Sequence, residues 1–292
     1  MGSKHPPFEY SPIVNREFDL PDGNHVAIWV VMNVEHDIYN KPVTTHLTSR
    51  TLNHSPDVFN FGWRDYGKRV GFWRLRDVFS EYNVPVTVAL NASICDHEPE
   101  IVEAGKNLDW EFMCHGETNS ERVAGLDIDE EREVIRNTRD KIEEAVGSRP
   151  VGWLGPGLTE TFNTLEILGE EDFRYVADWA NDEIPYLMDT TEGEVIGMPY
   201  TLEMNDVPMN LNYNLSAREY EETLIDQFDA LYAEGQEEEN GKVMTIAVHD
   251  YLTGHPHRSL HLANALDHIT SHDGVWLATG SEIANHYAKN NL

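Results

Sequence analysis

A histidine and an asparagine stand four residues apart at the end of a short apolar run. The run from Glu111 to Cys114 leads into His115, and Asn119 follows within the sequence HGETN. A second imidazole at this spacing would complete half of a zinc site, because imidazole nitrogen is a strong zinc ligand. Asparagine offers only a neutral carbonyl oxygen, which is a poor zinc ligand. The pair therefore has the spacing of a metal site, with asparagine in the place of the second ligand.

Other groups capable of acid–base chemistry follow other apolar runs. Asn33 and Glu35 follow the run that starts at His25, and His249 follows a run near the C-terminus. Further polar and aromatic residues at the ends of such runs are Trp153, Asp178, Trp179, Asp206 and Arg258. Carboxylates and imidazoles can take a proton from water and give one to a leaving group. These side chains therefore predict a hydrolytic site, provided that the ends of the runs lie together.

The apolar runs alternate with amphipathic segments, as strands and helices do around a parallel sheet. With seven or eight mostly parallel strands and no second core, the expected fold is an α/β protein with a distorted (β/α) barrel. In such barrels the chemistry lies at the C-terminal ends of the strands. The main expected strands lie at 25–37, 84–93, 110–115 and 241–250, the main helices at 67–83, 127–147 and 216–235, and a long polar loop at 38–66.

The expected domain organisation is a proline-rich N-terminal arm over residues 1–24 and one barrel domain over residues 25–292. Two cysteines, Cys95 and Cys114, are too few for a disulfide framework, so a reduced, cytoplasmic setting is expected. The sequence contains no stretch close to the ~20 apolar residues of a membrane helix. A homo-oligomer is also expected.

The charge balance is strongly acidic. The chain of 292 residues carries 52 acidic and 21 basic residues, which gives a formal net charge of −31. Such a surface repels nucleic acid and anionic membranes, so neither is expected as a partner. Many hydrated carboxylates keep a protein soluble at high salt, and only seven of the basic residues are lysine. We therefore interpret the composition as adaptation to a halophilic environment.

Taken together, the sequences at the strand ends resemble the polysaccharide deacetylase superfamily. The resemblance is carried by NVEH, HGETN, GWLGPG, DWANDEIPY, PYTLEMND and VHDYLTGHPHR, and it covers nearly the whole chain. Within the superfamily, the pattern is most similar to the subgroup that contains metal-independent allantoinases and related cyclic-amide hydrolases. The opening YSPIVNREFDLPDGNHVAIWVV is also typical of that subgroup.

At several positions the chain departs from the deacetylase pattern. The deacetylases carry two aspartates on the first strand, where this chain has Asn33 and Glu35. They carry a pair of histidines where this chain has His115 and Asn119, and an arginine where it has Trp153. The resemblance thus implies that an Asp-His-His metal site has become Glu-His-Asn. The aspartate of a later motif matches Asp178, and the late histidine matches His249.

The metal-free interpretation assigns catalytic roles to three residues. Glu35 would act as the general base that activates water, and its pKa would have to be raised for efficient catalysis at neutral pH. His249 would protonate the leaving nitrogen or stabilise the oxyanion. Asp178 would orient His249 by accepting its other N–H. If a divalent ion such as zinc is bound instead, Glu35 and His115 are the expected ligands.

The sequence therefore predicts a hydrolase of C–N amide bonds that acts on a small, cyclic amide or ureide and needs no cofactor. One alternative is a metal-dependent N-deacetylase of polysaccharides or amino sugars. A second alternative is a non-catalytic relative that binds carbohydrate. The residues expected to bind substrate are Asn33, Asn119, Trp153, Trp179, Asp206 and Arg258.

Overall fold

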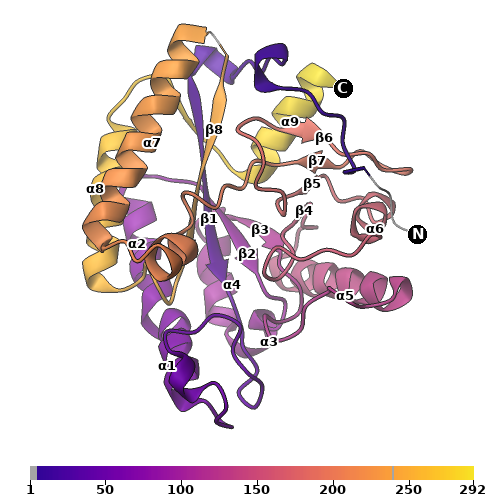
Figure 1. Ribbon diagram of the computed structural model, residues 1–292, viewed down its shortest axis with the longest axis vertical. Helices are drawn as coiled ribbons and strands as arrows, with labels where there is room; N and C mark the ends of the chain where they lie inside the picture. Colours follow the sequence, from indigo (N-terminus) through magenta and orange to yellow (C-terminus); the bar gives the residue numbers. More distant parts are fainter. Residues whose placement is uncertain (1–4, 239) are drawn as a thin grey trace.

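A curled sheet forms the centre of the molecule in the computed structural model, which describes residues 5–238 and 240–292 (Figure 1). In this part of the chain the strands run in the order β6-β7-β5-β4-β3-β2-β1-β8, and β9 pairs with β1. Every pairing is parallel except that of β6 with β7. The predicted distorted barrel is thus confirmed as a half-barrel. The strands are β1 Val26–Val34, β2 Val86–Leu90, β3 Glu111–Cys114, β4 Gly152–Trp153, β5 Tyr175–Val176, β6 Tyr186–Leu187, β7 Ile196–Gly197, β8 Lys242–His249 and β9 Val275–Leu277.

Strands β1 and β8 are the two longest strands and pair with each other at one end of the strand order. All their residues are buried, which explains why both segments are apolar over most of their length instead of alternating with polar residues. The register pairs Asn33 with His249, so the ends of the two strands lie side by side. This register places the polar residues that follow β1 next to those that follow β8.

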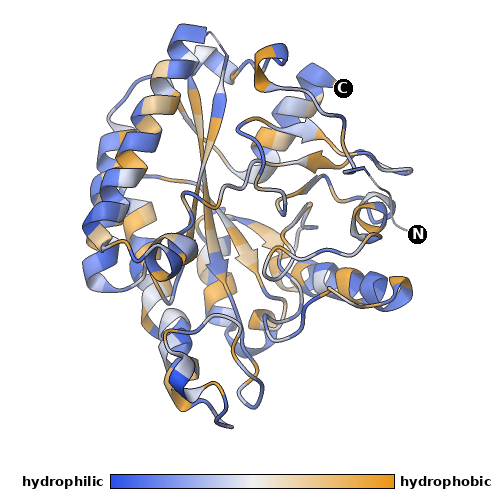
Figure 2. Cartoon of the chain, in the orientation of Figure 1, coloured by the Kyte–Doolittle hydropathy of each residue, from blue (hydrophilic) through white to orange (hydrophobic). Residues whose placement is uncertain are grey.

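Helices cover the outside of the sheet. In Figure 1, α7 and α8 lie side by side along β8, and Figure 2 shows that the strands are mainly apolar and that polar residues predominate on the outer faces of the helices. The α-helices are α1 Val58–Tyr66, α2 Phe72–Glu81, α3 Ile94–His97, α4 Pro99–Lys106, α5 Ile128–Val146, α6 Thr164–Glu170, α7 Ala217–Glu238, α8 Pro256–Thr270 and α9 Gly280–Asn291. Short 3₁₀ helices lie at Ile13–Asn15, Pro21–Gly23 and Ser49–Thr51, and π-helical turns at Gly67–Gly71 and Pro208–Asn212.

The segment 38–66 differs from the expected loop, because its last part is helix α1. The side chain of Asp57 accepts the backbone N–H of Asn60 and so caps the helix at its first turn. The side-chain oxygen Oδ1 of Asn60 accepts the backbone N–H groups of Leu47 and Thr48, and Arg64 is buried on the same helix. Polar contacts thus hold α1 in place.

The N-terminal segment lies against the body of the protein. Phe18 and Leu20 are buried, and the ring of Phe8 packs edge-on against Trp179. Residues 1–4 of the predicted arm lie outside the described residues. No helix in the described part of the chain has the length and apolarity required to cross a membrane.

Candidate active site

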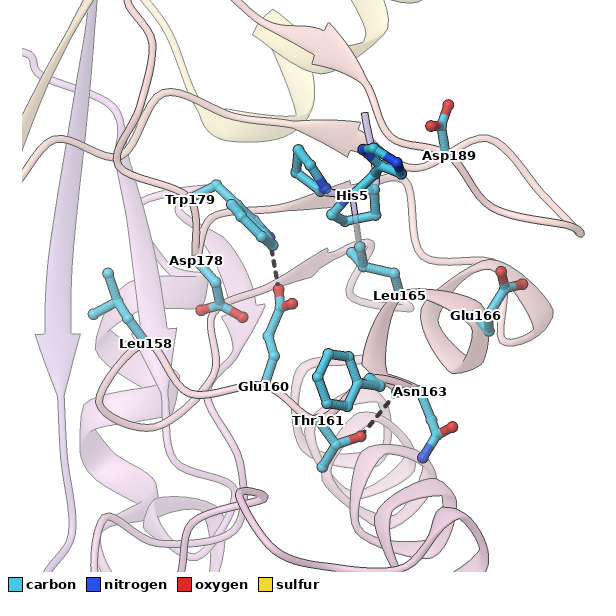
Figure 3. A pocket seen from close by; sticks show the side chains of 13 residues that line it. His5, Leu158, Glu160, Thr161, Asn163, Leu165, Glu166, Asp178, Trp179 and Asp189 are labelled. Carbon is cyan, nitrogen blue, oxygen red and sulfur yellow. Dashed lines mark hydrogen bonds between the residues drawn. The ribbon is translucent and has the colours of Figure 1, made fainter. Parts of the chain in front are cut away.

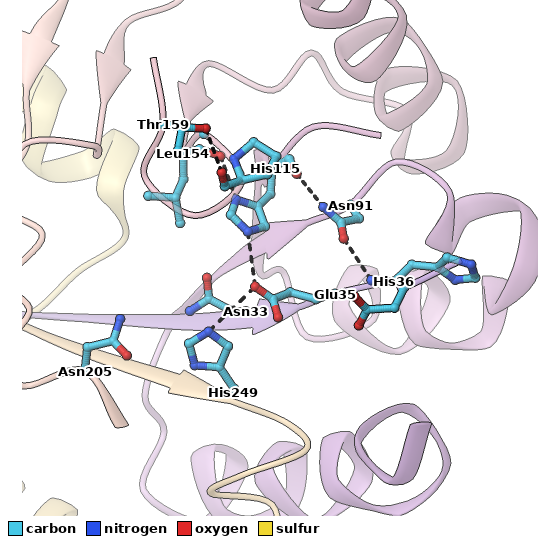
Figure 4. Close-up of polar contacts among 12 residues, drawn as sticks. Asn33, Glu35, His36, Asn91, His115, Leu154, Thr159, Asn205 and His249 are labelled. Atoms are coloured by element: carbon cyan, nitrogen blue, oxygen red, sulfur yellow. Dashed lines mark hydrogen bonds and ion pairs between the residues drawn. The ribbon is translucent and has the colours of Figure 1, made fainter. Parts of the chain in front are cut away.

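Glu35 lies one residue beyond β1, and two imidazoles face one of its carboxylate oxygens (Figure 4). Oε1 of Glu35 is 3.4 Å from Nε2 of His115 and 3.7 Å from Nε2 of His249. The three side chains come from the ends of β1, β3 and β8, and all three are buried. The structure thus brings together the base, the proton donor and the tentative metal ligand that the sequence indicated separately.

The orientation of His115 is fixed by backbone groups. Its Nδ1 is 2.6 Å from the carbonyl oxygen of Leu154, which can only accept a hydrogen bond. Nδ1 therefore carries the proton, and the lone pair of Nε2 points toward Glu35. The side chain of Asn91 donates to the carbonyl oxygen of His115 and also accepts the backbone N–H of His36. Asn91 thus ties the end of β3 to the end of β1.

His249 is oriented by Asp206, whereas Asp178 was the predicted partner. Nδ1 of His249 lies 2.6 Å from Oδ1 of Asp206, and Oδ2 of Asp206 accepts the backbone N–H of His249 at 2.8 Å. Burial acts to lower the pKa of His249, but the carboxylates of Asp206 and Glu35 outweigh it and raise the pKa above 6.5. A proton on Nε2 of His249 therefore faces Glu35 and the cavity beside it.

Arg64 on α1 forms a buried ion pair with Glu35. Nη2 of Arg64 is 2.5 Å from Oε2 of Glu35, and Nε of Arg64 pairs with Asp37. Burial acts to raise the pKa of Glu35, but the positive charges of Arg64 and His249 outweigh burial and hold it well below 4.5. The expectation of a raised pKa for Glu35 is therefore wrong, because a buried arginine that no sequence pattern indicates lies beside the carboxylate.

A small cavity of about 230 Å³ opens beside these groups. Two buried polar atoms at its wall, Oδ1 of Asn119 and Oγ1 of Thr44, have no hydrogen-bond partner. Nδ2 of Asn33 donates to the hydroxyl of Tyr200 and to the carbonyl of Val248. Four asparagine side chains contribute to the wall, namely Asn33, Asn119, Asn205 and Asn212.

Four of the residues predicted for the site lie elsewhere. Trp153 is fully buried and packs edge-on against Phe173 in the core. Trp179 and Asp178 line a different pocket, where the indole N–H of Trp179 donates to Glu160 (Figure 3). Burial and the charge of Glu160 raise the pKa of Asp178. Arg258 lies in the first turn of α8 and is not part of the cavity wall among the described residues.

Two arginines at the site were missed. Arg64 lies in the segment expected to be a loop, where Asp57 as a helix cap and the amphipathic spacing of the residues after it indicate a helix. Arg122 follows Asn119 in the loop after β3 and lines the cavity, and its guanidinium lies over Gly157. Gly157 has a φ of +68°, and a Cβ atom there would come within 3.1 Å of Cζ of Arg122. Among the described residues, Arg122 is the one lysine or arginine in the cavity wall.

The site is a poor fit for a divalent metal ion. A cation held by Glu35 would sit beside the guanidinium of Arg64, which already neutralises that carboxylate. The position after His115 where a second imidazole would be needed holds Asn119, whose carboxamide oxygen is a weak ligand. A water molecule at the point where the three side chains converge can instead donate to Glu35 and to Nε2 of His115 and accept from Nε2 of His249.

Comparisons with known proteins support a deacetylase fold and amide chemistry. Residues 59–176 match the sequence model of the family described as "Polysaccharide deacetylase". A protein of Schizosaccharomyces pombe (strain 972 / ATCC 24843) named "Putative polysaccharide deacetylase" is 30% identical over 239 residues, which cover 75% of this chain and 73% of that protein.

Two solved structures share the fold over nearly the full length. Puue allantoinase has a TM-score of 0.85 at 28% identity, with 93% of each chain covered. A protein titled "probable Polysaccharide deacetylase" from Pseudomonas aeruginosa PAO1 has a TM-score of 0.83 at 28% identity, with 93% of this chain and 94% of that chain covered. The half-barrel and the site define a hydrolase of C–N amide bonds. The chain belongs to the polysaccharide deacetylase family.

Proposed function

We propose that the protein opens a small cyclic amide or ureide, as an allantoinase does. The cavity volume of about 230 Å³ is below the roughly 300–1,000 Å³ typical of sites for drug-sized ligands. A single small ring suits this space better than a polysaccharide segment does. The allantoinase structure with a TM-score of 0.85 supports the same substrate class.

The observation that carries the proposal is the pair of unpartnered polar atoms in the cavity wall. Leaving a buried polar atom without a partner costs about 1–3 kcal/mol, so such atoms in a binding cavity indicate contacts with a ligand. Oδ1 of Asn119 can accept an N–H group, and the hydroxyl of Thr44 can donate to a carbonyl. A ring that contains an N–H beside a C=O presents both groups.

In the proposed reaction, Glu35 and His115 hold the attacking water. Glu35 is ionised over the whole neutral range, so it is always available to accept a proton as the water attacks the carbonyl carbon, although its lowered pKa makes it a weaker base than a carboxylate tuned to neutral pH. Nε2 of His249 then gives its proton to the leaving nitrogen, and Asp206 stabilises the imidazolium before that transfer. The ring opens to an amine or urea nitrogen at one end and a carboxylic acid at the other; the acid gives its proton to the neutral His249 and becomes a carboxylate, and Glu35 releases the proton taken from water to solvent.

Arg122 suits the product end of this reaction. Ring opening creates a carboxylate inside a chain whose net charge is −31, so the product would be repelled without a local cation. The guanidinium of Arg122 lies in the cavity wall and can hold such a carboxylate in a bidentate manner. The proposed mechanism requires no metal ion, in keeping with the ion pair between Arg64 and Glu35.

The second candidate is the N-deacetylation of an amino sugar or polysaccharide. It is favoured by the relative from S. pombe, whose name describes a polysaccharide deacetylase. An acetamido group also presents an N–H and a C=O, so the same atoms of Asn119 and Thr44 could hold it. The two candidates differ in whether the substrate must fit entirely within the cavity.

A substrate panel tests both candidates. Purified protein is incubated with allantoin, hydantoin, dihydrouracil, succinimide, N-acetylglucosamine and chitin oligosaccharides, at low and molar salt, with EDTA or with added zinc. We expect turnover of at least one cyclic compound in the presence of EDTA. Release of acetate from the sugars, with no ring opened in any condition, would replace the cyclic-amide proposal with the deacetylase.

A further inference from the structure

Three metal-binding side chains converge on the outer side of helices α7 and α8. His268 lies in the last turn of α8, His272 lies two residues beyond its end, and Asp229 lies on α7. One ligand atom from each of the three lies within 4.8 Å of the other two. In the part of the chain that the structure describes, this is the one group of three such residues with that spacing.

Hydrogen bonds orient these side chains for binding. Nδ1 of His272 lies 2.8 Å from the carbonyl oxygen of His268, so Nδ1 carries the proton and Nε2 keeps its lone pair. A ligating histidine usually donates its other N–H to a carbonyl or carboxylate in this way. Nε2 of His268 is 2.7 Å from Oδ1 of Asp229, which joins the two helices.

Aromatic rings restrict the movement of both imidazoles. The ring of Phe228 packs edge-on against His268 and His272, with centroid distances of 5.7 Å and 5.0 Å. Tyr232 contacts His272 from one turn further along α7, at 5.4 Å. Rings held on two sides lose less conformational freedom on binding an ion than freely rotating surface histidines do.

A neighbouring pair on the same two helices shows what is specific to this group. His261 on α8 contacts Glu221 on α7, two helical turns before His268 and Asp229. That pair serves the same bridging purpose between the helices, and it belongs to no group of three metal-binding residues among the described ones. Two side chains are therefore enough to bridge α7 and α8. Bridging of the helices does not explain why a second histidine, His272, lies beside the pair of His268 and Asp229.

We propose that Asp229, His268 and His272 form a binding site for a divalent transition-metal ion such as Zn²⁺. Two imidazole nitrogens and one carboxylate oxygen are suitable zinc ligands, and the partial exposure of the site allows water to complete a tetrahedral set. Ligand atoms about 3.4 Å apart surround a zinc ion at 2.0–2.2 Å, so small side-chain rotations bring these three into place. The ion takes the position of the proton that His268 shares with Asp229.

Binding at this site would clamp the end of α8 to α7. The clamp would also fix the turn that leads into β9, where the hydroxyl of Tyr232 already donates to the carbonyl of Asp273. An ion that binds only the folded chain stabilises it by mass action. The site is independent of the hydrolytic reaction, since none of its residues lines the cavity beside Glu35.

Titration of the full chain with Zn²⁺ alone, in competition with a chromophoric chelator, tests the proposal. We expect the wild-type protein to bind one more zinc ion than His272→Gln does. Asp229→Asn should lower the affinity for that ion at least tenfold. The matched control His261→Gln removes the neighbouring bridge and keeps the ion. Circular dichroism confirms that each variant is folded before titration.

Thermal unfolding gives a second readout that does not depend on activity. Zinc at one hundred times its Kd should raise the Tm of wild-type protein and of His261→Gln by about 4 °C, and that of His272→Gln by about 1 °C or less. Equal zinc stoichiometry and equal Tm shifts in wild type and His272→Gln would overturn the proposal. Any zinc bound near Glu35 is common to all variants and cancels in this comparison.

Discussion

Nδ1 of His249 lies 2.6 Å from Oδ1 of Asp206, and the other oxygen of the same carboxylate accepts the backbone N–H of His249. Asp206 also accepts the hydroxyl of Thr253, so its carboxylate is fully buried and fixed in position. This pairing sets both the direction and the pKa of the imidazole. It favours the protonated form of His249 and so suits it as a proton donor, although the ring is surrounded by protein.

Asp206→Asn should lower the pKa of His249, because the variant removes the closest of the two carboxylates that raise it. A general acid must be protonated, so activity falls as pH rises through the pKa of His249. The alkaline limb of the kcat profile should therefore move to lower pH, and kcat at pH 7 should drop about 10²–10⁴-fold.

The matched control for this change is Thr253→Val, which removes one hydrogen bond to Asp206 and keeps its charge. Its alkaline limb should stay close to that of the wild type. If Asp206→Asn reduced kcat without moving the limb, His249 would not be the proton donor, and Asp206 would have a structural role only.

Glu35→Gln should keep the fold and leave less than about a tenth of the wild-type kcat, because an amide cannot accept a proton from water. The fold is expected to survive because Arg64 retains its pairing with Asp37. The pKa of Glu35 lies well below 4.5, so the acid limb of the wild-type profile should lie below pH 4.5. Single-turnover rates between pH 3.5 and 8 measure both quantities.

His115→Gln tests whether His115, and not Glu35, is the group that accepts the proton of the water. If His115 is that group, the pH profile of kcat loses its acid limb in His115→Gln and keeps it in Glu35→Gln. Retention of more than a tenth of kcat in Glu35→Gln would transfer the role of base to His115. Circular dichroism and Tm confirm in each case that the loss is chemical and does not reflect unfolding.

The sequence predicts this fold well where its pattern reflects burial. The strands β1 and β8 are continuous apolar runs because both faces are covered, and the polar residue that ends each run marks the edge of the sheet. Helix α5 is bounded as its sequence indicates, by a capping box at Asp127 and by Gly147 with a φ of +90°. The convergence of Glu35, His115 and His249 follows from the parallel order of their strands.

The sequence does not predict contacts that depend on loop geometry. Asp178 and Asp206 both follow strand segments of similar composition, and only the path of the chain decides that Asp206 meets His249. Arg64 reaches Glu35 because α1 folds back over the sheet end, and nothing in the spacing of 29 residues between them indicates this. The position of Trp153 at a strand end predicts contact with substrate, whereas its side chain fills the core.

Salt should stabilise the folded protein. At a net charge of −31 the compact state repels itself more than the expanded chain does, and counterions screen that repulsion. Tm should rise steadily from dilute buffer to 2 M KCl, by roughly 5 °C or more. A flat or falling curve would contradict adaptation to high salt. Sorbitol at matched water activity controls for effects other than screening.

Chelation and a restored ligand decide whether the hydrolytic site uses a metal ion. The ion pair of Arg64 with Glu35 leaves little net negative charge for a cation, and Asn119 is a weak ligand. EDTA-treated protein should therefore keep most of its activity on a cyclic amide. Asn119→His should gain zinc affinity, since imidazole is a much stronger donor than a carboxamide oxygen, but it should lose turnover because its ring occupies the place of the substrate N–H.

Both measurements are best made in the His272→Gln background, where the proposed outer site does not contribute zinc. Zinc content is determined by elemental analysis beside kcat, before chelation, after chelation and after zinc is added back. Asn119→Gln serves as the control, because it keeps the amide chemistry and changes only its reach. Near-stoichiometric zinc in the protein with Asn119 intact, with activity lost on chelation and regained with zinc, would overturn the metal-free mechanism and favour the metal-dependent deacetylase.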